Sequence, residues 1–161
     1  LLMKLLAFLL GLLLCASAYA DCIDNAAAYH RVDPLLARSI AIHESRLNPR
    51  ATHRNSDGSE DIGLMQINSV HLPRLARFGI TRDMLFDACI NAYVGTWILR
   101  EIIDRLGPTW NAVGAYNARD PLKRQRYANS IFSQWQSLQR TADRYTQERP
   151  APQQPVAIGA N

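Results

Sequence analysis

The chain lacks the long apolar runs and the concentrated charge that would place it in several common classes of protein. Its clearest apolar run, Leu5 to Leu14, has ten residues, about half of what a membrane-spanning helix needs. The formal net charge is only +4 over 161 residues, and no dense run of Lys and Arg forms the basic footprint of a nucleic-acid-binding protein. We therefore expect no integral membrane span in the mature protein and no nucleic-acid partner.

Metal and phosphate motifs are also missing. The four histidines have no regular ligand spacing. His43-Glu44 begins like the helix of a zinc metalloprotease, but Leu47 stands where that motif has its second histidine. Gly58-Ser59-Glu60 is no phosphate loop, because its acidic side chain would repel phosphate. We expect no metal ion and no cofactor.

The first twenty residues have the order of a secretory signal peptide. Lys4 precedes the apolar run, and Ala18-Tyr19-Ala20 supplies the small residues of a cleavage site. Cleavage after Ala20 would make the protein periplasmic and, with the loss of Lys4, leave a net charge of +3. A lipid anchor at Cys15 is disfavoured, because Leu14 stands where such a site needs a small residue.

The remaining chain divides into one domain, residues 21–145, and a Pro-rich tail, residues 146–161, whose composition is typical of disorder. Cys22 and Cys89 form an even pair in an oxidising compartment, so we predict a disulfide between them. The alternative is two buried free thiols.

Helical signals dominate the domain, and the predicted class is all-α or nearly so. Asp33-Pro34 and Asp120-Pro121 each read as an N-cap followed by proline in the first turn. The polar, turn-rich segment near 50–62 predicts a loop or a small β-hairpin flap, and no pattern indicates a multi-strand sheet. The predicted helices cover 22–31, a segment from Pro34 that ends at Asn48-Pro49, a segment from Ser69 that ends before Gly79, a short one after Thr81, 87–106 as the longest, one from Thr109 through Tyr116, and one from Asp120 through Leu138.

Glu44 is the strongest candidate for chemistry. It follows Leu36 and Ile40 at four-residue steps, so it points to the buried side of its helix. It also lies in the last turn, where unpaired carbonyls make the potential negative. Both effects disfavour the ionised carboxylate and favour a general acid. The position alone fits a partly exposed helix-end glutamate equally well.

Three ordered motifs resemble the soluble lytic transglycosylase family, a branch of the lysozyme-like fold. They are Glu44-Ser45 with Asn48-Pro49, then Gly63 to Asn68 (GLMQIN), then Ala115-Tyr116-Asn117. The resemblance covers about residues 22–139. Asp61-Ile62 and the cysteine pair are similar to the small secreted subgroup that accompanies type III and type IV secretion, conjugation and pilus assembly.

The resemblance implies a helical domain with a substrate groove and gives its residues roles. Glu44 would be the catalytic acid, and Ser45 would orient its neighbourhood or the sugar. Met65 and Gln66 would line the groove, Tyr116 would hydrogen-bond near the Glu44 carboxyl, and Asn117 would hold the following turn or touch substrate. Met65 and Tyr116 could equally be core residues, and Gln66 and Asn117 could be local backbone caps.

The reaction implied is peptidoglycan cleavage by a monomer. A lone acid suffices if the 6-hydroxyl of N-acetylmuramic acid attacks its own C1 and leaves a 1,6-anhydro end. A lysozyme-type hydrolase would need a second carboxylate, for which Asp57, Glu60 and Asp61 are candidates. A third alternative is a wall-binding component of a secretion, conjugation or pilus machine that has no catalytic activity.

Overall fold

A computed structural model describes residues 22–148 of the chain. The predicted signal peptide and residues 149–161 of the predicted tail lie outside this range. Residues 146–148, which we assigned to the tail, form the last turn of a helix. Within 22–148, none of the helices is both long and apolar enough to cross a membrane.

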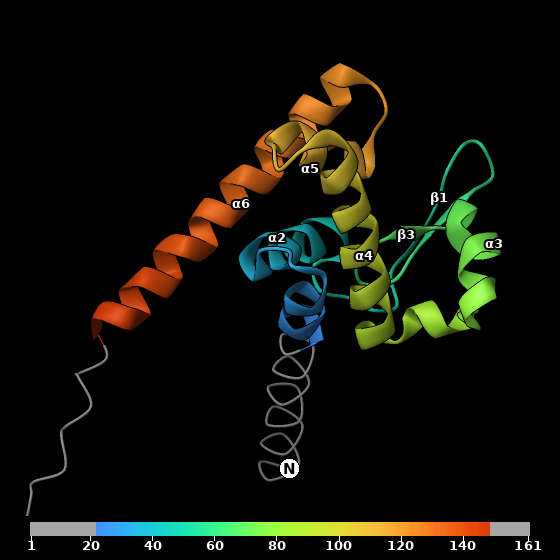
Figure 1. Cartoon of the computed structure of the whole chain (residues 1–161), viewed down its shortest axis with the longest axis horizontal. Helices are drawn as coiled ribbons and strands as arrows, with labels where there is room; N and C mark the ends of the chain where they lie inside the picture. The colour runs from blue at the N-terminus through green and yellow to red at the C-terminus, as the bar shows by residue number, and fades with distance from the viewer. Residues whose placement is uncertain (1–21, 149–161) are drawn as a thin grey trace, which may run out of the picture.

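The domain is mostly helical, with a small antiparallel sheet at one side, which confirms the predicted fold class (Figure 1). The first helix covers residues 22–30. The other helices are α2 (Pro34–Ser45), α3 (Leu72–Leu75), α4 (Ala88–Leu106), α5 (Trp110–Asn117) and α6 (Pro121–Glu148), with 3-10 turns η1 (Ser69–His71), η2 (Ala76–Phe78) and η3 (Asp83–Phe86).

Polar side chains start the main helices where the sequence predicted them. Asp33 accepts a hydrogen bond from the backbone N–H of Leu36 at the start of α2. Asp87 and Thr109 cap α4 and α5 in the same way, and Asp120 accepts from the N–H of Lys123 at the start of α6. Each bond satisfies an N–H that has no partner within the helix.

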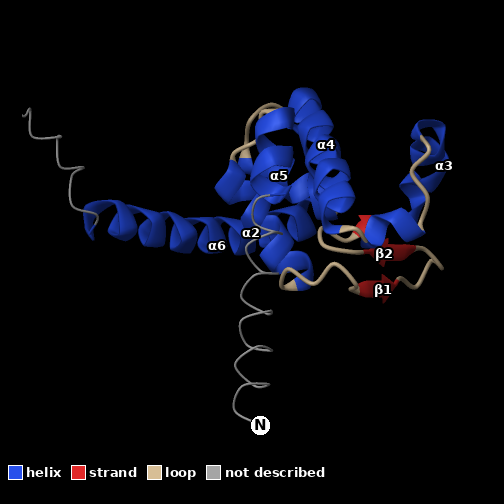
Figure 2. Cartoon of the chain, turned by 90° about the horizontal axis from the view of Figure 1, so that it is seen from below, coloured by secondary structure: helices blue, strands red, loops and turns tan. Residues whose placement is uncertain are grey.

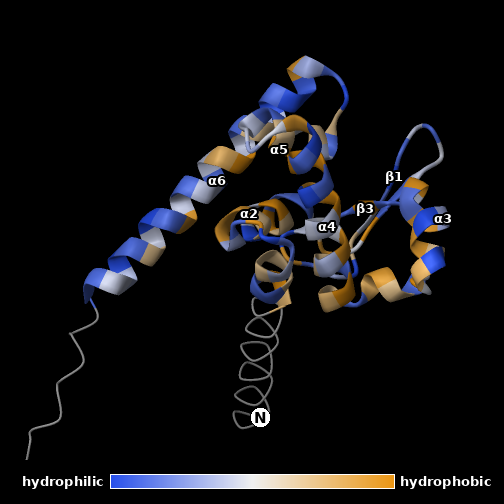
Figure 3. Ribbon diagram, in the orientation of Figure 1, coloured by the Kyte–Doolittle hydropathy of each residue, from blue (hydrophilic) through white to orange (hydrophobic). Residues whose placement is uncertain are grey.

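The longest helix is α6, with 28 residues, and the prediction that 87–106 would be the longest was wrong. The first half of α6 buries Tyr127 and Ile131 against the domain. The second half extends away from the body (Figure 1) and is mainly hydrophilic (Figure 3). It therefore lacks the apolar stripe by which we recognised helices, although it contains no proline or glycine to end it.

Three short strands form one sheet, whereas we expected at most a hairpin. The hairpin near 50–62 is present as β1 (Thr52–Arg54) and β2 (Glu60–Ile62) (Figure 2). A third strand, β3 (Ile67–Asn68), pairs antiparallel with β2, so that Asp61 lies opposite Asn68 and Ile62 opposite Ile67. Two residues are too few to show an alternating pattern, which is why the sequence did not reveal this strand.

One apolar core connects the helices to the sheet. Ile40 of α2, Leu99 of α4 and Ile131 of α6 are fully buried, and Ile62 and Ile67 join them from the sheet. This packing places the C-terminal end of α2 beside the sheet and beside the first half of α6, and these elements carry the candidate site.

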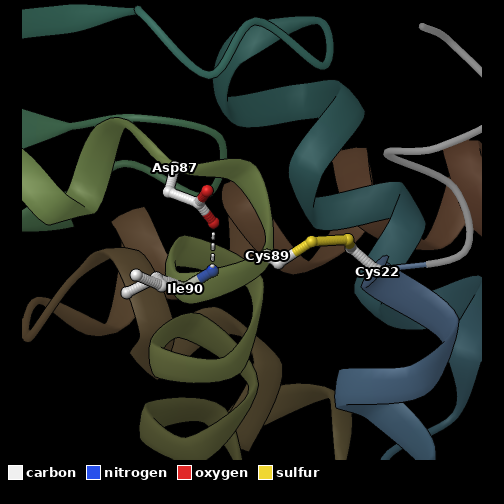
Figure 4. Close-up of a disulfide and its surroundings, with 4 residues drawn as sticks. All are labelled: Cys22, Asp87, Cys89 and Ile90. Carbon is white, nitrogen blue, oxygen red and sulfur yellow. Dashed lines mark hydrogen bonds between the residues drawn. A yellow bond between two sulfur atoms is a disulfide. The ribbon is translucent and has the colours of Figure 1, made fainter.

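A disulfide joins Cys22 to Cys89, as predicted, with the Cα atoms 4.9 Å apart (Figure 4). It links the first helix to the first turn of α4, where Asp87 caps the backbone N–H of Ile90. The bond closes a loop of 67 residues, which in the chain-entropy model stabilises the fold by about 4 kcal/mol.

We therefore expect no free thiol in the mature protein. Titration of the denatured, unreduced protein with a thiol reagent should give no reaction at Cys22 or Cys89, and two reactive thiols after reduction. Two reactive thiols before reduction would contradict the bond.

Candidate active site

An open groove runs between the sheet, the end of α2 and the junction of α5 with α6. It consists of two adjoining hollows of about 590 and 570 Å³. The same five side chains line both hollows: Glu44, Asn55, Asp61, Gln66 and Asn117. Five groups from four segments of the chain thus converge on one concave surface, which is the usual form of a small-molecule or polymer site.

Glu44 lies in the last turn of α2, where the helix stops because Arg46 adopts a left-handed conformation with φ of 55°. The helix thus ends at Ser45, four residues before Pro49, which the sequence predicts as part of the stop signal. The half-buried Glu44 carboxylate accepts a hydrogen bond of 2.5 Å from the hydroxyl of Tyr127.

Burial is the main cause that raises the pKa of Glu44 to about 7. The hydrogen bond from Tyr127 opposes this shift by favouring the ionised form, and the negative charge of Asp61 adds to it. A carboxyl group with this pKa exists in both protonation states near neutral pH. It can therefore donate a proton in one step of a reaction and accept one in the next.

Ser45 connects α2 to the segment that follows β2. Its hydroxyl donates a hydrogen bond of 2.7 Å to the carbonyl of Leu64 and accepts one from the N–H of Asn48. Gly63 starts this segment with φ of +76°, and a Cβ there would lie 2.3 Å from both Asn91 Nδ2 and the carbonyl oxygen of Leu85. The position admits only glycine, which explains the glycine of the second motif.

Met65 is fully buried and lies against Gly95 of α4, where a Cβ would be 2.5 Å from the Met65 sulfur. Its backbone N–H donates to the buried side chain of Asn91. Of the two positions considered from the sequence, groove or core, the structure places the Met65 side chain in the core. It therefore supports the groove from below.

Gln66 does line the groove and also ties its backbone together. Its side-chain amide donates to the carbonyls of Gly63, at 2.9 Å, and Ala51, at 3.2 Å. Its φ of +50° is rare for a residue with a side chain, and such conformations gather at functional sites, where the surroundings enforce them.

The third motif reaches the groove differently from our expectation. We expected Tyr116 to hydrogen-bond near the Glu44 carboxyl, but its hydroxyl donates to the carbonyl of Met65, at 2.9 Å. Burial, together with the charges of Glu44 and Asp61, raises the pKa of Tyr116 well above its usual value, so it remains a neutral donor. Asn117, the exposed last residue of α5, lines both hollows.

Tyr127 holds the position at Glu44 that we had assigned to Tyr116. In the sequence it is one member of the apolar stripe of α6, and nothing local marks it as a site residue. Burial, and then the neighbouring charge of Glu44, raise the pKa of its hydroxyl. The rings of His43 and Tyr127 pack edge-to-face, with 5.2 Å between their centroids.

Removing this hydroxyl should shift the pH dependence of any activity that needs protonated Glu44. The Tyr127→Phe variant loses a donor that stabilises the Glu44 carboxylate, so the pKa of Glu44 rises above about 7. We expect the alkaline fall in rate to move to higher pH by about half a unit or more. A pH–rate profile measured beside wild type tests this, and an unmoved or acid-shifted fall would contradict it.

Comparison with known proteins identifies relatives of the chain. Residues 21–136 match the family described as "Transglycosylase SLT domain". The chain is 42% identical over 127 residues to "Invasion protein IagB" of Salmonella typhimurium, covering 76% of this chain and 79% of that protein. It is 36% identical over 121 residues to "Protein IpgF" of Shigella flexneri (72% and 80%). It is also 37% identical over 139 residues to a "Peptidoglycan-binding-like protein" of Escherichia coli O157:H7 (78% and 83%).

Proposed function

The chain belongs to the transglycosylase SLT domain family, and we propose that it cleaves the β-1,4 bond between N-acetylmuramic acid and N-acetylglucosamine in peptidoglycan. In this proposal the product carries a 1,6-anhydro-muramic end. The observation that carries it is the half-buried carboxyl of Glu44 in the wall of the groove, whose pKa burial raises to about 7.

Glu44 serves first as acid and then as base. Its proton passes to the bridging oxygen, the bond from that oxygen to C1 of the muramic acid breaks, and its electron pair leaves with the N-acetylglucosamine. The 6-hydroxyl oxygen of the same muramic acid then bonds to C1, and its proton returns to the Glu44 carboxylate. Water takes no part, and the attacking hydroxyl is already held close to C1.

The supporting residues would place Glu44 and the sugar. Ser45 joins the end of α2 to the backbone of Leu64. Gln66 joins its own segment to the carbonyls of Gly63 and of Ala51, the residue before β1. Asn117 faces the groove from α5 and is proposed to contact substrate. Tyr127, rather than Tyr116, is proposed to orient the Glu44 carboxyl.

The alternative of hydrolysis, as in lysozyme, needs a second carboxylate close to Glu44. Of the three candidates, Glu60 is held outside the groove by a two-pronged ion pair with Arg82, at 2.6 and 2.9 Å. Asp57 is exposed in the turn between β1 and β2, where it accepts from Ser59. Only Asp61 lines both hollows together with Glu44.

The cellular setting is proposed from the relatives. One is named an invasion protein, which supports a role in opening the periplasmic wall locally for a secretion, conjugation or pilus machine. Another is named a peptidoglycan-binding-like protein, and binding without catalysis is the alternative. A pure binder has no use for a carboxyl whose burial opposes its ionisation.

Digestion of purified peptidoglycan tests the proposed function. We expect the wild-type protein to release fragments whose muramic ends lack the mass of one water, as a 1,6-anhydro ring requires, when the products are analysed by mass spectrometry. Reducing ends would indicate hydrolysis. Absence of release by folded wild-type protein would indicate a binding component.

A further inference from the structure

The second half of α6 carries a narrow row of apolar side chains along one face. This row, the α6 seam, consists of Trp135, Leu138, Ala142 and Tyr145. Leu138 is half-buried, whereas Ala142 is exposed and Tyr145 is 72% exposed. The seam lies on the part of the helix that leaves the body of the domain (Figure 1), and the rest of the helix surface there is hydrophilic (Figure 3).

Most of the α6 seam lies outside the part of the chain that the family shares. The match to the transglycosylase SLT domain ends at residue 136, whereas α6 continues to Glu148. A lone helix shorter than about 12 to 15 residues is only marginally stable in water, so a partner that covers the seam would stabilise this extension. The expectation of a monomer came from the family resemblance and does not reach these residues.

The spacing of the seam is that of a coiled coil. Its side chains follow one another at steps of three, four and three residues, as the a and d positions of two heptads do. Trp135 and Ala142 would hold the a positions, and Leu138 and Tyr145 the d positions. A seam this narrow fits the matching seam of a second helix, so the occupant that suits it is an amphipathic helix.

The positions that flank the seam favour an identical helix over a foreign one. Gln134, Gln139, Thr141 and Thr146 hold the e and g positions beside the seam and are uncharged, and only Glu148 at its end is charged. Charges at these positions usually select a partner of complementary charge. Without them, two copies of the same helix can meet without repulsion between like charges.

The order of side chains along the seam also suits two copies. Trp135 and Tyr145 lie equally far on either side of residue 140, and so do Leu138 and Ala142. Two antiparallel copies of α6 related by a twofold axis at residue 140 would therefore bring Leu138 opposite Ala142 of the second copy, and Trp135 opposite Tyr145 of the second copy. The pairing of a large with a small side chain at the centre lets the two helices approach closely.

Partly exposed aromatic rings lie where Tyr145 of the second copy would arrive. Trp135 packs against Trp110 of α5 and Phe132 of α6, with ring centroids 5.8 and 6.1 Å apart. Trp110 and Phe132 are each 38% exposed. Aromatic side chains are enriched at protein interfaces, where they supply most of the binding energy. The body of one copy thus offers an aromatic surface to the helix end of the other.

We propose that two copies of this chain pair through the α6 seam as a short antiparallel coiled coil. Pairing leaves the groove open, because α6 lines the groove at its other end, with Asp120 and Lys123. At 1.5 Å per residue, Lys123 lies about 22 Å along the helix from Leu138. The inference is independent of the proposed function, since it concerns a surface away from Glu44.

Sedimentation equilibrium of the chain from Asp21 to Asn161 tests the pairing. We expect the mean mass to rise from that of one copy at about 1 µM to nearly that of two copies at about 500 µM, because two heptads give a weak and reversible dimer. A protein that stays monomeric up to about 500 µM would overturn the inference and would point to a different occupant, such as a helix of another protein.

Ala142→Glu should raise the dissociation constant of the dimer at least about tenfold, because it places a charge opposite the apolar Leu138 of the second copy. Glutamate forms helices well, so the circular dichroism spectrum should not change. Gln147→Glu is the matched control, since it adds the same charge to the same helix on the face opposite the seam, and it should dimerise like wild type. Equal dimerisation of the two variants would place the interface elsewhere and contradict the inference.

A mixture of two variants tests the direction of pairing. Leu138→Lys alone should also be monomeric, because it adds a charge to the same apolar layer. In the antiparallel arrangement its new lysine faces the new glutamate of Ala142→Glu, so the mixture should regain a dimer that neither variant forms alone. A parallel pair would place residue 142 opposite residue 142 and recover nothing. No dimer in the mixture, measured by sedimentation with one variant labelled, would therefore contradict the antiparallel pair.

Discussion

Glu44→Gln should reduce the rate of peptidoglycan cleavage at least about 10²-fold while leaving the fold intact. Glutamine has the same shape, and its side-chain oxygen can still accept the hydrogen bond from Tyr127. It cannot donate a proton to the bridging oxygen or receive one from the 6-hydroxyl. The loss should therefore appear in kcat, with KM close to the wild-type value, when release of fragments from purified peptidoglycan is measured at pH 6.

Asp104→Asn is a suitable control for this variant, because Asp104 is an exposed acid that pairs with Arg100 on α4 and lines neither hollow of the groove. The same circular dichroism spectrum and the same binding to insoluble peptidoglycan would show that Glu44→Gln is folded and competent to bind. Activity near the wild-type level in a folded Glu44→Gln protein would remove Glu44 from the mechanism.

The same substitution should stabilise the protein, and the gain should depend on pH. In the folded state the pKa of Glu44 is about 7, against an ordinary value of 4.5. Between these values the unfolded chain releases its proton while the folded protein retains it, so the free energy of unfolding falls as the pH rises. This decrease in the free energy of unfolding is complete above pH 7 and amounts to about 3 kcal/mol for this pKa difference.

The glutamine in Glu44→Gln cannot titrate, so the free energy of unfolding of this variant does not fall with pH on account of this residue. We expect its free energy of unfolding to equal that of wild type near pH 4 and to exceed it by about 3 kcal/mol at pH 8.5. Urea unfolding at both pH values measures the difference, and Asp104→Asn should show no such pH-dependent gain. A constant difference between Glu44→Gln and wild type at both pH values would mean that Glu44 ionises as easily in the folded protein as in the unfolded chain.

Much of the fold followed from local rules in the sequence. Asp33, Asp87, Thr109 and Asp120 begin their helices because a side-chain oxygen satisfies a free backbone N–H, and this depends on only three or four neighbouring residues. The predictions failed where no local pattern exists. Strand β3 has two residues and is defined by its pairing with β2.

The site was predictable to the extent that its residues belong to contiguous motifs. Glu44 is identified by its four-residue spacing from Ile40 and by the motif that it shares with Ser45. Gly63 belongs to the second motif, and the structure shows that its position admits only glycine. The exchange of Tyr116 for Tyr127 as the partner of Glu44 was not predictable, because it depends on how α6 packs across α2. Asp61 was one of three candidate acids, and only the pairing of β2 places it on the groove face.

Digestion of peptidoglycan in water enriched in ¹⁸O tests the central claim. In this claim Glu44 catalyses attack by the 6-hydroxyl of the muramic acid, and not by water, on C1 of the same sugar. The account predicts 1,6-anhydro ends without incorporated ¹⁸O for the wild-type protein, and no release by Glu44→Gln. One ¹⁸O atom at each new reducing end would mean that water attacks C1 and would contradict the account.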